Sequence, residues 1–244
     1  MYNLLIGIAA GVAVTLAILF GTNVGWVGSI VPGLVTAIAV YFVLARRTWK
    51  QLEGLFEEVQ RELQAQRIEK AVKVLERGFA LAPWQFLVAS QVHAQIGVLQ
   101  YVKGDLDAAL PHLEKAFSRH WLARAMLGAA RYRRNDFAGM QSAFEQTVKV
   151  SKKEGLAWAA YAWCLESRDR HEDAVKVLGR GVATNPSDDK LKTALQTLQN
   201  GKRLKLGKLY GEQWYQFRLE PMPPQYVSPA GSMRGSRRAI YGKR

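Results

Sequence analysis

The chain has 244 residues and a formal net charge of +14, with 34 Lys and Arg against 20 Asp and Glu. This length allows one sizeable domain with additional segments. The single cysteine, Cys164, excludes an internal disulfide framework and is expected to be a packed small residue. The four histidines are scattered over different predicted helices, so the sequence predicts no metal site and no cofactor.

Two uncharged, apolar runs open the chain, at residues 4–20 and 27–44. As a helix each run is about 26 Å long, close to the hydrocarbon thickness of a bilayer. Residues 21–26 form the turn between them. We therefore interpret residues 1–47 as a transmembrane helical hairpin. A signal peptide fits poorly because no basic residue precedes the first run. Two core helices of a soluble domain would not be apolar on all faces.

Basic residues follow the second apolar run directly, whereas the turn between the runs has none. The positive-inside rule then places both ends of the hairpin on the cytoplasmic side. Aromatic and basic side chains at these ends are placed to contact lipid headgroups. The predicted membrane-interface residues are Trp26, Arg46, Arg47, Trp49 and Lys50.

Gly7 and Gly11 form a pair of small residues four positions apart in the first run. Such pairs let two helices approach closely. One interpretation is that they pack the two helices of the hairpin together. The other is that they mediate homo-oligomerisation or docking on another membrane protein.

From residue 48 the pattern becomes amphipathic, with Leu52, Leu55, Phe56, Val59 and Leu63 at helical spacing. No helix breaker separates this stretch from the second apolar run. The sequence therefore predicts one long helix that leaves the membrane and becomes the first helix of the following domain.

Residues 66–186 contain a repeated pattern. The position that begins the second helix of each pair is held by Ala71, Ala109, Met140 and Ala174, at intervals of 38, 31 and 34 residues. Gly97 and Gly128 fall where two paired helices would cross closely. Gly104 and Asn135 fall where a helix would end in the left-handed conformation. Pro83 and Pro186 would close their repeats.

This pattern resembles the tetratricopeptide repeat (TPR), whose period is about 34 residues. The alternative is a generic helical bundle with accidental spacing. The predicted fold is all-α: the transmembrane hairpin, then a TPR-like α-solenoid of about four helix pairs over residues 48–200, then an extended tail over 201–244. Residues 187–189 predict the start of a capping helix over 190–199, which would cover the apolar end of the solenoid.

The resemblance implies a peptide-binding groove lined by the first helix of each pair. Some TPR proteins clamp a terminal carboxylate with Asn, but Val98, Ala129 and Trp163 stand at the equivalent positions here, so that mode is not expected. An apolar or aromatic segment suits the groove better, and the tail itself is one candidate occupant. The alternative is that these side chains belong to the core. The predicted groove residues are Val98, Tyr101, Leu122, Ala129, Tyr132, Arg133, Leu156 and Trp163.

The tail is rich in basic, Pro and Gly residues, yet its first half carries aromatic side chains, which are rare in disordered segments. That half is expected to dock through Leu209, Tyr210, Trp214, Tyr215 and Phe217. The last residues could bind anionic lipid or nucleic acid through Arg234, Arg237, Arg238, Lys243 and Arg244. Because these basic residues are sparse, nucleic acid is not the expected main partner.

The sequence shows no Gly-rich phosphate loop and no nucleophile with a base at useful spacing, so an enzyme is not expected. The layout is similar to that of bacterial inner-membrane TPR proteins that serve as assembly factors. This likeness implies a scaffold in the cytoplasmic (inner) membrane, with repeats and tail facing the cytoplasm, that binds protein partners and assembles a membrane complex. The alternatives are an accessory subunit held in a larger complex by its tail, and a lipid- or nucleic-acid-binding tail.

Overall fold

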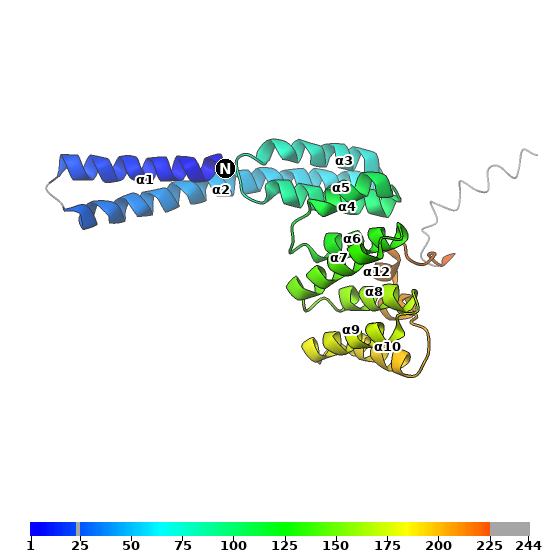
Figure 1. Cartoon of the computed structure of the whole chain (residues 1–244). Coiled ribbons are helices and arrows are strands. Elements are labelled where there is room, and N and C mark those ends of the chain that lie inside the picture. The colour runs from blue at the N-terminus through cyan, green and yellow to red at the C-terminus, as the bar shows by residue number, and fades with distance from the viewer. Residues whose placement is uncertain (23–24, 225–244) are drawn as a thin grey trace, which may run out of the picture. The chain divides into compact units, whose positions relative to one another are not determined.

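The computed structural model describes residues 1–22 and 25–224, and every element in these ranges is a helix (Figure 1). The predicted all-α class is therefore confirmed. The chain divides into two compact units. The first unit comprises Met1–Lys103 and Asp107–Phe117, and the second comprises Gly104–Leu106 and the chain from Ser118 onward. The solenoid predicted for residues 48–200 is thus shared between the two units.

The hairpin consists of α1 (Tyr2–Gly21) and the first half of α2 (Trp26–Gln64), which lie side by side in Figure 1. Glycines form the contact between them. A Cβ atom at Gly11 would lie 2.6 Å from the carbonyl oxygen of Gly33, and one at Gly7 would lie 2.9 Å from that of Ala37. Gly7 and Gly11 therefore pack the hairpin itself, and a second copy would have to displace α2 to use them.

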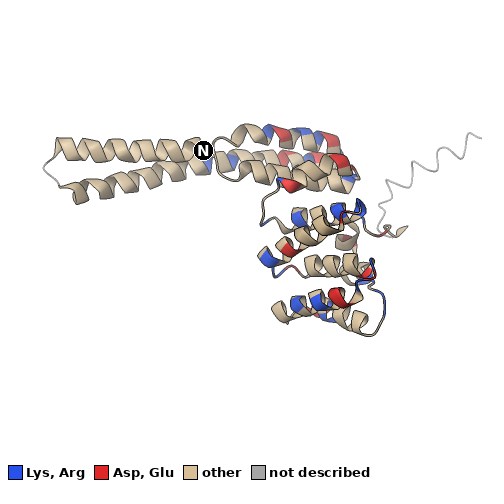
Figure 2. Cartoon of the chain, viewed as in Figure 1, with Lys and Arg blue, Asp and Glu red and all other residues tan. Residues whose placement is uncertain are grey.

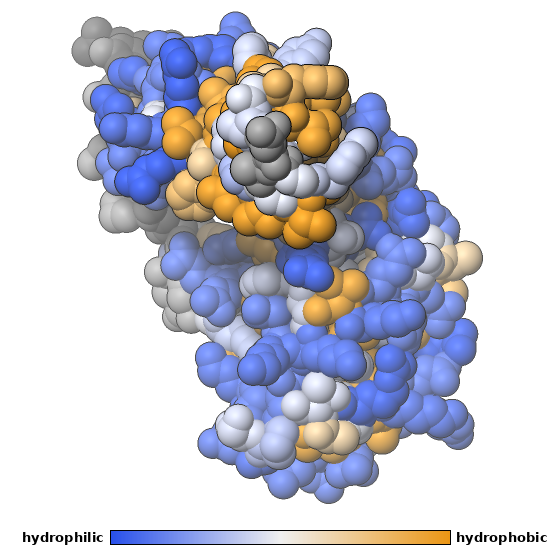
Figure 3. Space-filling view, turned by 90° about the vertical axis from the view of Figure 1, so that its left-hand side faces the viewer, coloured by the Kyte–Doolittle hydropathy of each residue, from blue (hydrophilic) through white to orange (hydrophobic). Residues whose placement is uncertain are grey.

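The outer surface of the hairpin is apolar. Figure 2 shows neither acidic nor basic colour on it, and Figure 3, which looks at its loop end, shows a largely hydrophobic surface. Both helices are long and apolar enough to cross a membrane, and only 11% of the most apolar window of each is buried. An exposed apolar surface of this extent is unfavourable in water.

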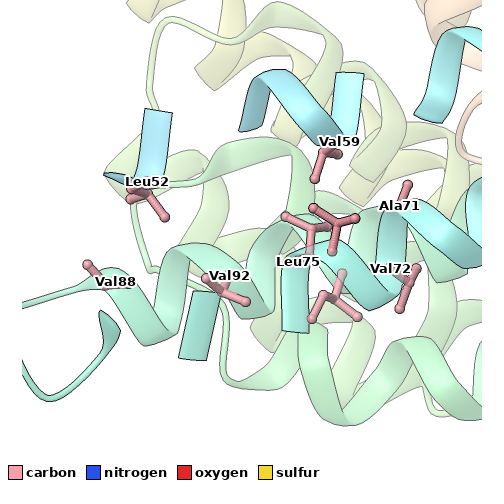
Figure 4. Packing of buried hydrophobic residues seen from close by; sticks show 9 residues of the cluster. Leu52, Val59, Ala71, Val72, Leu75, Val88 and Val92 are labelled. Atoms are coloured by element: carbon pink, nitrogen blue, oxygen red, sulfur yellow. The ribbon is translucent and has the colours of Figure 1, made fainter. Parts of the chain in front are cut away.

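Helix α2 continues without a break for 39 residues, so the predicted long helix is confirmed. Its second half joins α3 (Ile68–Glu76), the short 3₁₀ helix η1 (Arg77–Leu81) and α4 (Val88–Lys103). Leu52 of α2, Leu75 of α3 and Val92 of α4 are almost fully buried together, as Figure 4 shows. The helix that carries the apolar hairpin thus also supplies one wall of the core of the first unit.

Polar contacts tie the start of α1 to α2 and to the segment before α4. The side-chain amide of Asn3 donates to Thr48 Oγ1 of α2 (3.0 Å) and to Gln85 Oε1 (3.3 Å). Gln85 Nε2 in turn donates to the hydroxyl of Tyr41 (3.3 Å), and the backbone N–H of Tyr2 donates to the carbonyl of Pro83 (2.9 Å). The bond between the buried Asn3 and Thr48 satisfies groups that would be costly to bury alone. Together the bonds fix the segment before α4 against the base of the hairpin.

Helices α4 and α5 (Leu106–Glu114) form the next pair. A Cβ at Gly97 would lie 2.8 Å from the side chain of Leu113, which is the close crossing that the sequence predicted. The rings of His93 on α4 and His112 on α5 also meet, with 3.0 Å between their Nδ1 atoms. Burial, and then the neighbouring His112 and Lys115, lower the pKa of His93 below 6.5. Burial and then Lys115 lower the pKa of His112, against an opposing effect of Glu76.

This histidine pair predicts that the first unit loses stability as pH falls. Below about pH 6.5 the two histidines bind protons more readily in the unfolded chain than in the folded one, so the free energy of unfolding decreases as pH falls. Above that pH both states are unprotonated at these histidines, and the pair contributes no pH dependence. We expect a lower unfolding temperature at about pH 5.5 than at about pH 7.5, and a smaller difference in His93→Gln. His171→Gln, which changes an exposed histidine, is the control. An unchanged pH dependence in His93→Gln would contradict the assignment.

The second unit contains two further pairs: α6 (Trp121–Arg133) with α7 (Phe137–Val150), and α8 (Gly155–Glu166) with α9 (His171–Thr184). The predicted left-handed residues are present, with φ of 103° at Gly104 and 61° at Asn135. Helix α10 (Asp189–Gln199) follows, capped by Asp188 Oδ1, which accepts from the N–H groups of Lys190 and Leu191. Two short helices, α11 (Leu206–Tyr210) and α12 (Glu212–Tyr215), complete the described chain.

Candidate functional site

The candidate site lies in the second unit, where the C-terminal ends of α6 and α8 present aromatic side chains. Tyr132 of α6 and Trp163 of α8 are both half-buried, with their ring centres 5.9 Å apart in an edge-to-face arrangement. The guanidinium of Arg168 lies 5.3 Å from the centre of the Tyr132 ring. Such an aromatic cluster offers a large apolar contact area with oriented N–H and O–H groups.

The chain's own C-terminal segment, residues 204–220, covers this cluster. Its Trp214 ring packs edge-to-face on Trp163 with 5.4 Å between ring centres, and Phe217 packs on Trp214 at 6.0 Å. Trp214, Phe217 and Leu206 are fully buried. Burying a large apolar side chain contributes about 1.5–3 kcal/mol. Residues 204–220 are therefore part of the core of the second unit.

Two glutamates join this segment to α8, Glu220 at its own end and Glu166 on that helix. The indole N–H of Trp214 donates to Oε2 of Glu220 (2.6 Å), and that of Trp163 donates to Oε1 of the same carboxylate (3.3 Å). At the other end, the backbone N–H of Leu204 donates to Oε2 of Glu166 on α8 (3.3 Å). Hydrogen bonds to a charged acceptor are stronger than neutral ones. The Glu220 carboxylate thus joins an indole of the segment to an indole of α8.

A polar pocket lies beside the covered cluster. Its volume is about 570 Å³, and Glu166, Glu220, Asp169, His171 and Arg203 are among its lining residues. It combines acidic and basic side chains. Within residues 1–22 and 25–224, no three His, Cys, Asp or Glu side chains are grouped in a way that could hold a metal ion.

The predicted groove residues do not form one open surface in the second unit. Tyr132 and Trp163 lie in the covered cluster, whereas Ala129 and Leu156 are buried in the helix core. Leu122 is half-buried, and Arg133 is exposed. The remaining two lie in the first unit, where Tyr101 is buried and Val98 is half-buried.

Of the predicted tail residues, Trp214, Phe217 and Tyr210 are buried, and Leu209 and Tyr215 are half-buried. Burial raises the pKa of the Tyr210 hydroxyl above its ordinary value, and Lys190 Nζ lies 5.1 Å from the centre of its ring. The predicted polyanion residues Arg234, Arg237, Arg238, Lys243 and Arg244 lie outside the described residues.

The predicted membrane-interface residues all lie on α2. Trp26 begins that helix and is 72% exposed, and Arg46, Arg47, Trp49 and Lys50 are exposed where its hairpin half ends. Sequence reasoning missed Glu220. The available signal was a carboxylate six residues after Trp214, one of two in the otherwise basic tail, the other being Glu212.

Comparison with solved structures finds a likeness of fold. No family model matches the chain, and no curated protein was found to match its sequence. Among solved structures, the crystal structure of MamA protein is similar, with a TM-score of 0.48 and 15% sequence identity, over 77% of this chain and 94% of that chain. At this level the likeness carries no argument about function. The description of the fold as TPR-like rests on the order of helix pairs described above.

Proposed function

We propose that this protein is a membrane-anchored helical scaffold that binds protein partners at the membrane. The observation that carries the proposal is α2, a single helix whose first half forms the apolar hairpin and whose second half is a wall of the first helical unit. A continuous helix of this kind holds the first unit at the membrane surface. Repeats of helix pairs bury their core between neighbours and leave extended outer faces for partners.

In this proposal the hairpin lies in the cytoplasmic membrane and the units face the cytoplasm, as the basic residues after the hairpin favour. Membership of the TPR family, and a role in assembling a membrane complex, are parts of the same proposal. The aromatic cluster around Trp163 in the second unit binds residues 204–220 of the same chain. A partner that uses this cluster must therefore displace that segment.

The test is purification of the tagged full-length protein from its native membrane in mild detergent, with identification of co-purifying proteins. The structure determines which C-terminal deletion is compared with the full-length protein. Removing residues 225–244 leaves the buried segment in place, whereas a longer deletion would take Trp214 and Phe217 from the core. Arg133→Ala, which changes an exposed predicted groove residue, is compared in parallel.

Defined membrane proteins that co-purify with the full chain would support the scaffold. Their release by Arg133→Ala would locate the contact on α6. Release by the deletion of 225–244 alone would favour an accessory subunit held by its tail. Recovery of lipid or nucleic acid alone, removed by salt, would contradict the scaffold in favour of polyanion binding.

A further inference from the structure

A pocket of about 760 Å³ lies in the first unit, between α2 and the segment that precedes α4. It starts beside the last part of the hairpin and extends along α2 past the first basic residues. Phe42, Trp49 and Phe86 supply apolar walls and are each more than half exposed. Exposed aromatic side chains at the end of an apolar hairpin are characteristic of a membrane–water interface.

Two basic residues lie in this pocket one helical turn apart. Arg46 and Lys50 occupy positions i and i+4 of α2 and so share one face of the helix. Neither forms an ion pair with an acidic residue in the described part of the chain. Asn3, near the start of α1, bonds to Thr48, so the two cations lie at the level where the two-helix hairpin ends. Glu53, also in the pocket, lies on the turn beyond Lys50, on the side away from the hairpin.

The opposite wall of the pocket is held in a strained conformation. Leu87 has a φ of +68°, which is rare for a bulky residue. Its carbonyl accepts the N–H of Gln91 (3.0 Å) and the hydroxyl of Ser90 (2.9 Å) at the start of α4. Gln85 is fixed by its bonds to Asn3 and Tyr41. Strain of this kind persists where surrounding contacts impose it, and it is frequent at binding sites.

We propose that this pocket binds one anionic glycerophospholipid, with its phosphate between Arg46 and Lys50 and the upper part of an acyl chain along Phe42 and Phe86. The inference rests on the proposed membrane anchoring. The order of the residues along α2 matches such a lipid, because Phe42 lies on the hairpin side of Arg46 and the cations lie where the hairpin ends. Glu53 disfavours an anion farther from the membrane, so the phosphate site is restricted to the Arg46–Lys50 turn.

Arg47 provides a matched control for the charge. It follows Arg46 in the sequence and carries the same charge, but it lines a different pocket, together with Asn3 and Trp84. General attraction of the basic residues after the hairpin to an anionic membrane surface would depend on Arg46 and Arg47 alike. A bound lipid in the Arg46–Lys50 pocket would depend on Arg46 and not on Arg47.

The experiment is native mass spectrometry of the full-length protein in mild detergent, titrated with dioleoyl phosphatidylglycerol or dioleoyl phosphatidylcholine. The wild-type protein should retain one phosphatidylglycerol in preference to phosphatidylcholine. Arg46→Ala should weaken phosphatidylglycerol binding about fivefold, and Arg46→Ala with Lys50→Ala about 30-fold. Arg47→Ala should leave it within about twofold. Phe86→Ser should weaken both lipids. Circular dichroism verifies that each variant is folded.

Three results would overturn the lipid site: no retained lipid, equal losses in Arg46→Ala and Arg47→Ala, or displacement of the lipid by inorganic phosphate alone. Alkaline carbonate extraction of the native membrane distinguishes a failure of the lipid site from a failure of the proposed membrane anchoring. A protein released by carbonate is not anchored, and the scaffold proposal fails with the lipid site. A protein that stays in the membrane but shows no lipid preference loses the lipid site only.

Discussion

Trp214→Ala is expected to destabilise the second unit by about 3–5 kcal/mol, the cost of removing a large aromatic side chain from a core. The ring is fully buried between Trp163 and Phe217, and its indole N–H bonds to Glu220. The substitution leaves a cavity and deprives a half-buried carboxylate of its shorter hydrogen bond. Trp214→Phe, which keeps an aromatic ring but loses the N–H, should have a smaller effect.

Cys164 provides a measurement specific to the second unit. It is the chain's single cysteine, it is fully buried on α8, and burial raises the pKa of its thiol. Alkylation of Cys164 therefore reports opening of this unit. In Trp214→Ala its rate should rise about a hundredfold or more, since each 1.4 kcal/mol corresponds to a factor of about ten. The control is Trp121→Ala, which changes a half-buried tryptophan of the same unit.

A Cys164 alkylation rate in Trp214→Ala no faster than in the wild type would contradict the structural role of residues 204–220. It would show that this segment contributes little to the core and can leave the aromatic cluster. In that case the cluster around Trp163 would be accessible to a partner, as the TPR resemblance implies. The measurement therefore tests whether the contact of residues 204–220 with the cluster contributes to the core.

Gly128→Ala is expected to destabilise the second unit by about 1–3 kcal/mol. A Cβ atom at this position would lie 2.6 Å from the Phe144 ring, where α6 crosses α7. The ring is fully buried and stacks on Tyr161 with 5.3 Å between ring centres. The two helices would have to move apart, and thermal unfolding followed by circular dichroism should show the loss.

Gly179→Ala is the matched control, because it makes the same change within a helix of the same unit, where a Cβ would meet no atom within 4 Å. This variant should be more stable than the wild type by about 0.5–1 kcal/mol, since alanine loses less backbone entropy in a helix. The two Gly→Ala changes thus have opposite expected signs. A stabilising effect of Gly128→Ala would show that the α6–α7 contact is looser than described.

The sequence by itself determined the features that local patterns encode. Uninterrupted apolarity over residues 4–20 and 27–44 indicated the hairpin helices, and the missing breaker after residue 44 indicated one long α2. The helix ends at Gly104 and Asn135 followed from residue types that tolerate a positive φ. The close crossings at Gly97 and Gly128 followed from the repeat. Each of these features depends on residues within one or two helical turns of one another, or on the period of the repeat.

Only the tertiary structure decided which surfaces are filled. The bonds from Trp163 and Trp214 to Glu220 join residues as many as 57 positions apart, and no period or motif links them. The same holds for the pocket at Arg46, one wall of which comes from Phe86 and the strained Leu87. Aromatic residues in the tail predicted docking, with the groove as only one candidate position, because apolar attraction has no direction. Only the fit of side chains in three dimensions selects the face on which they pack.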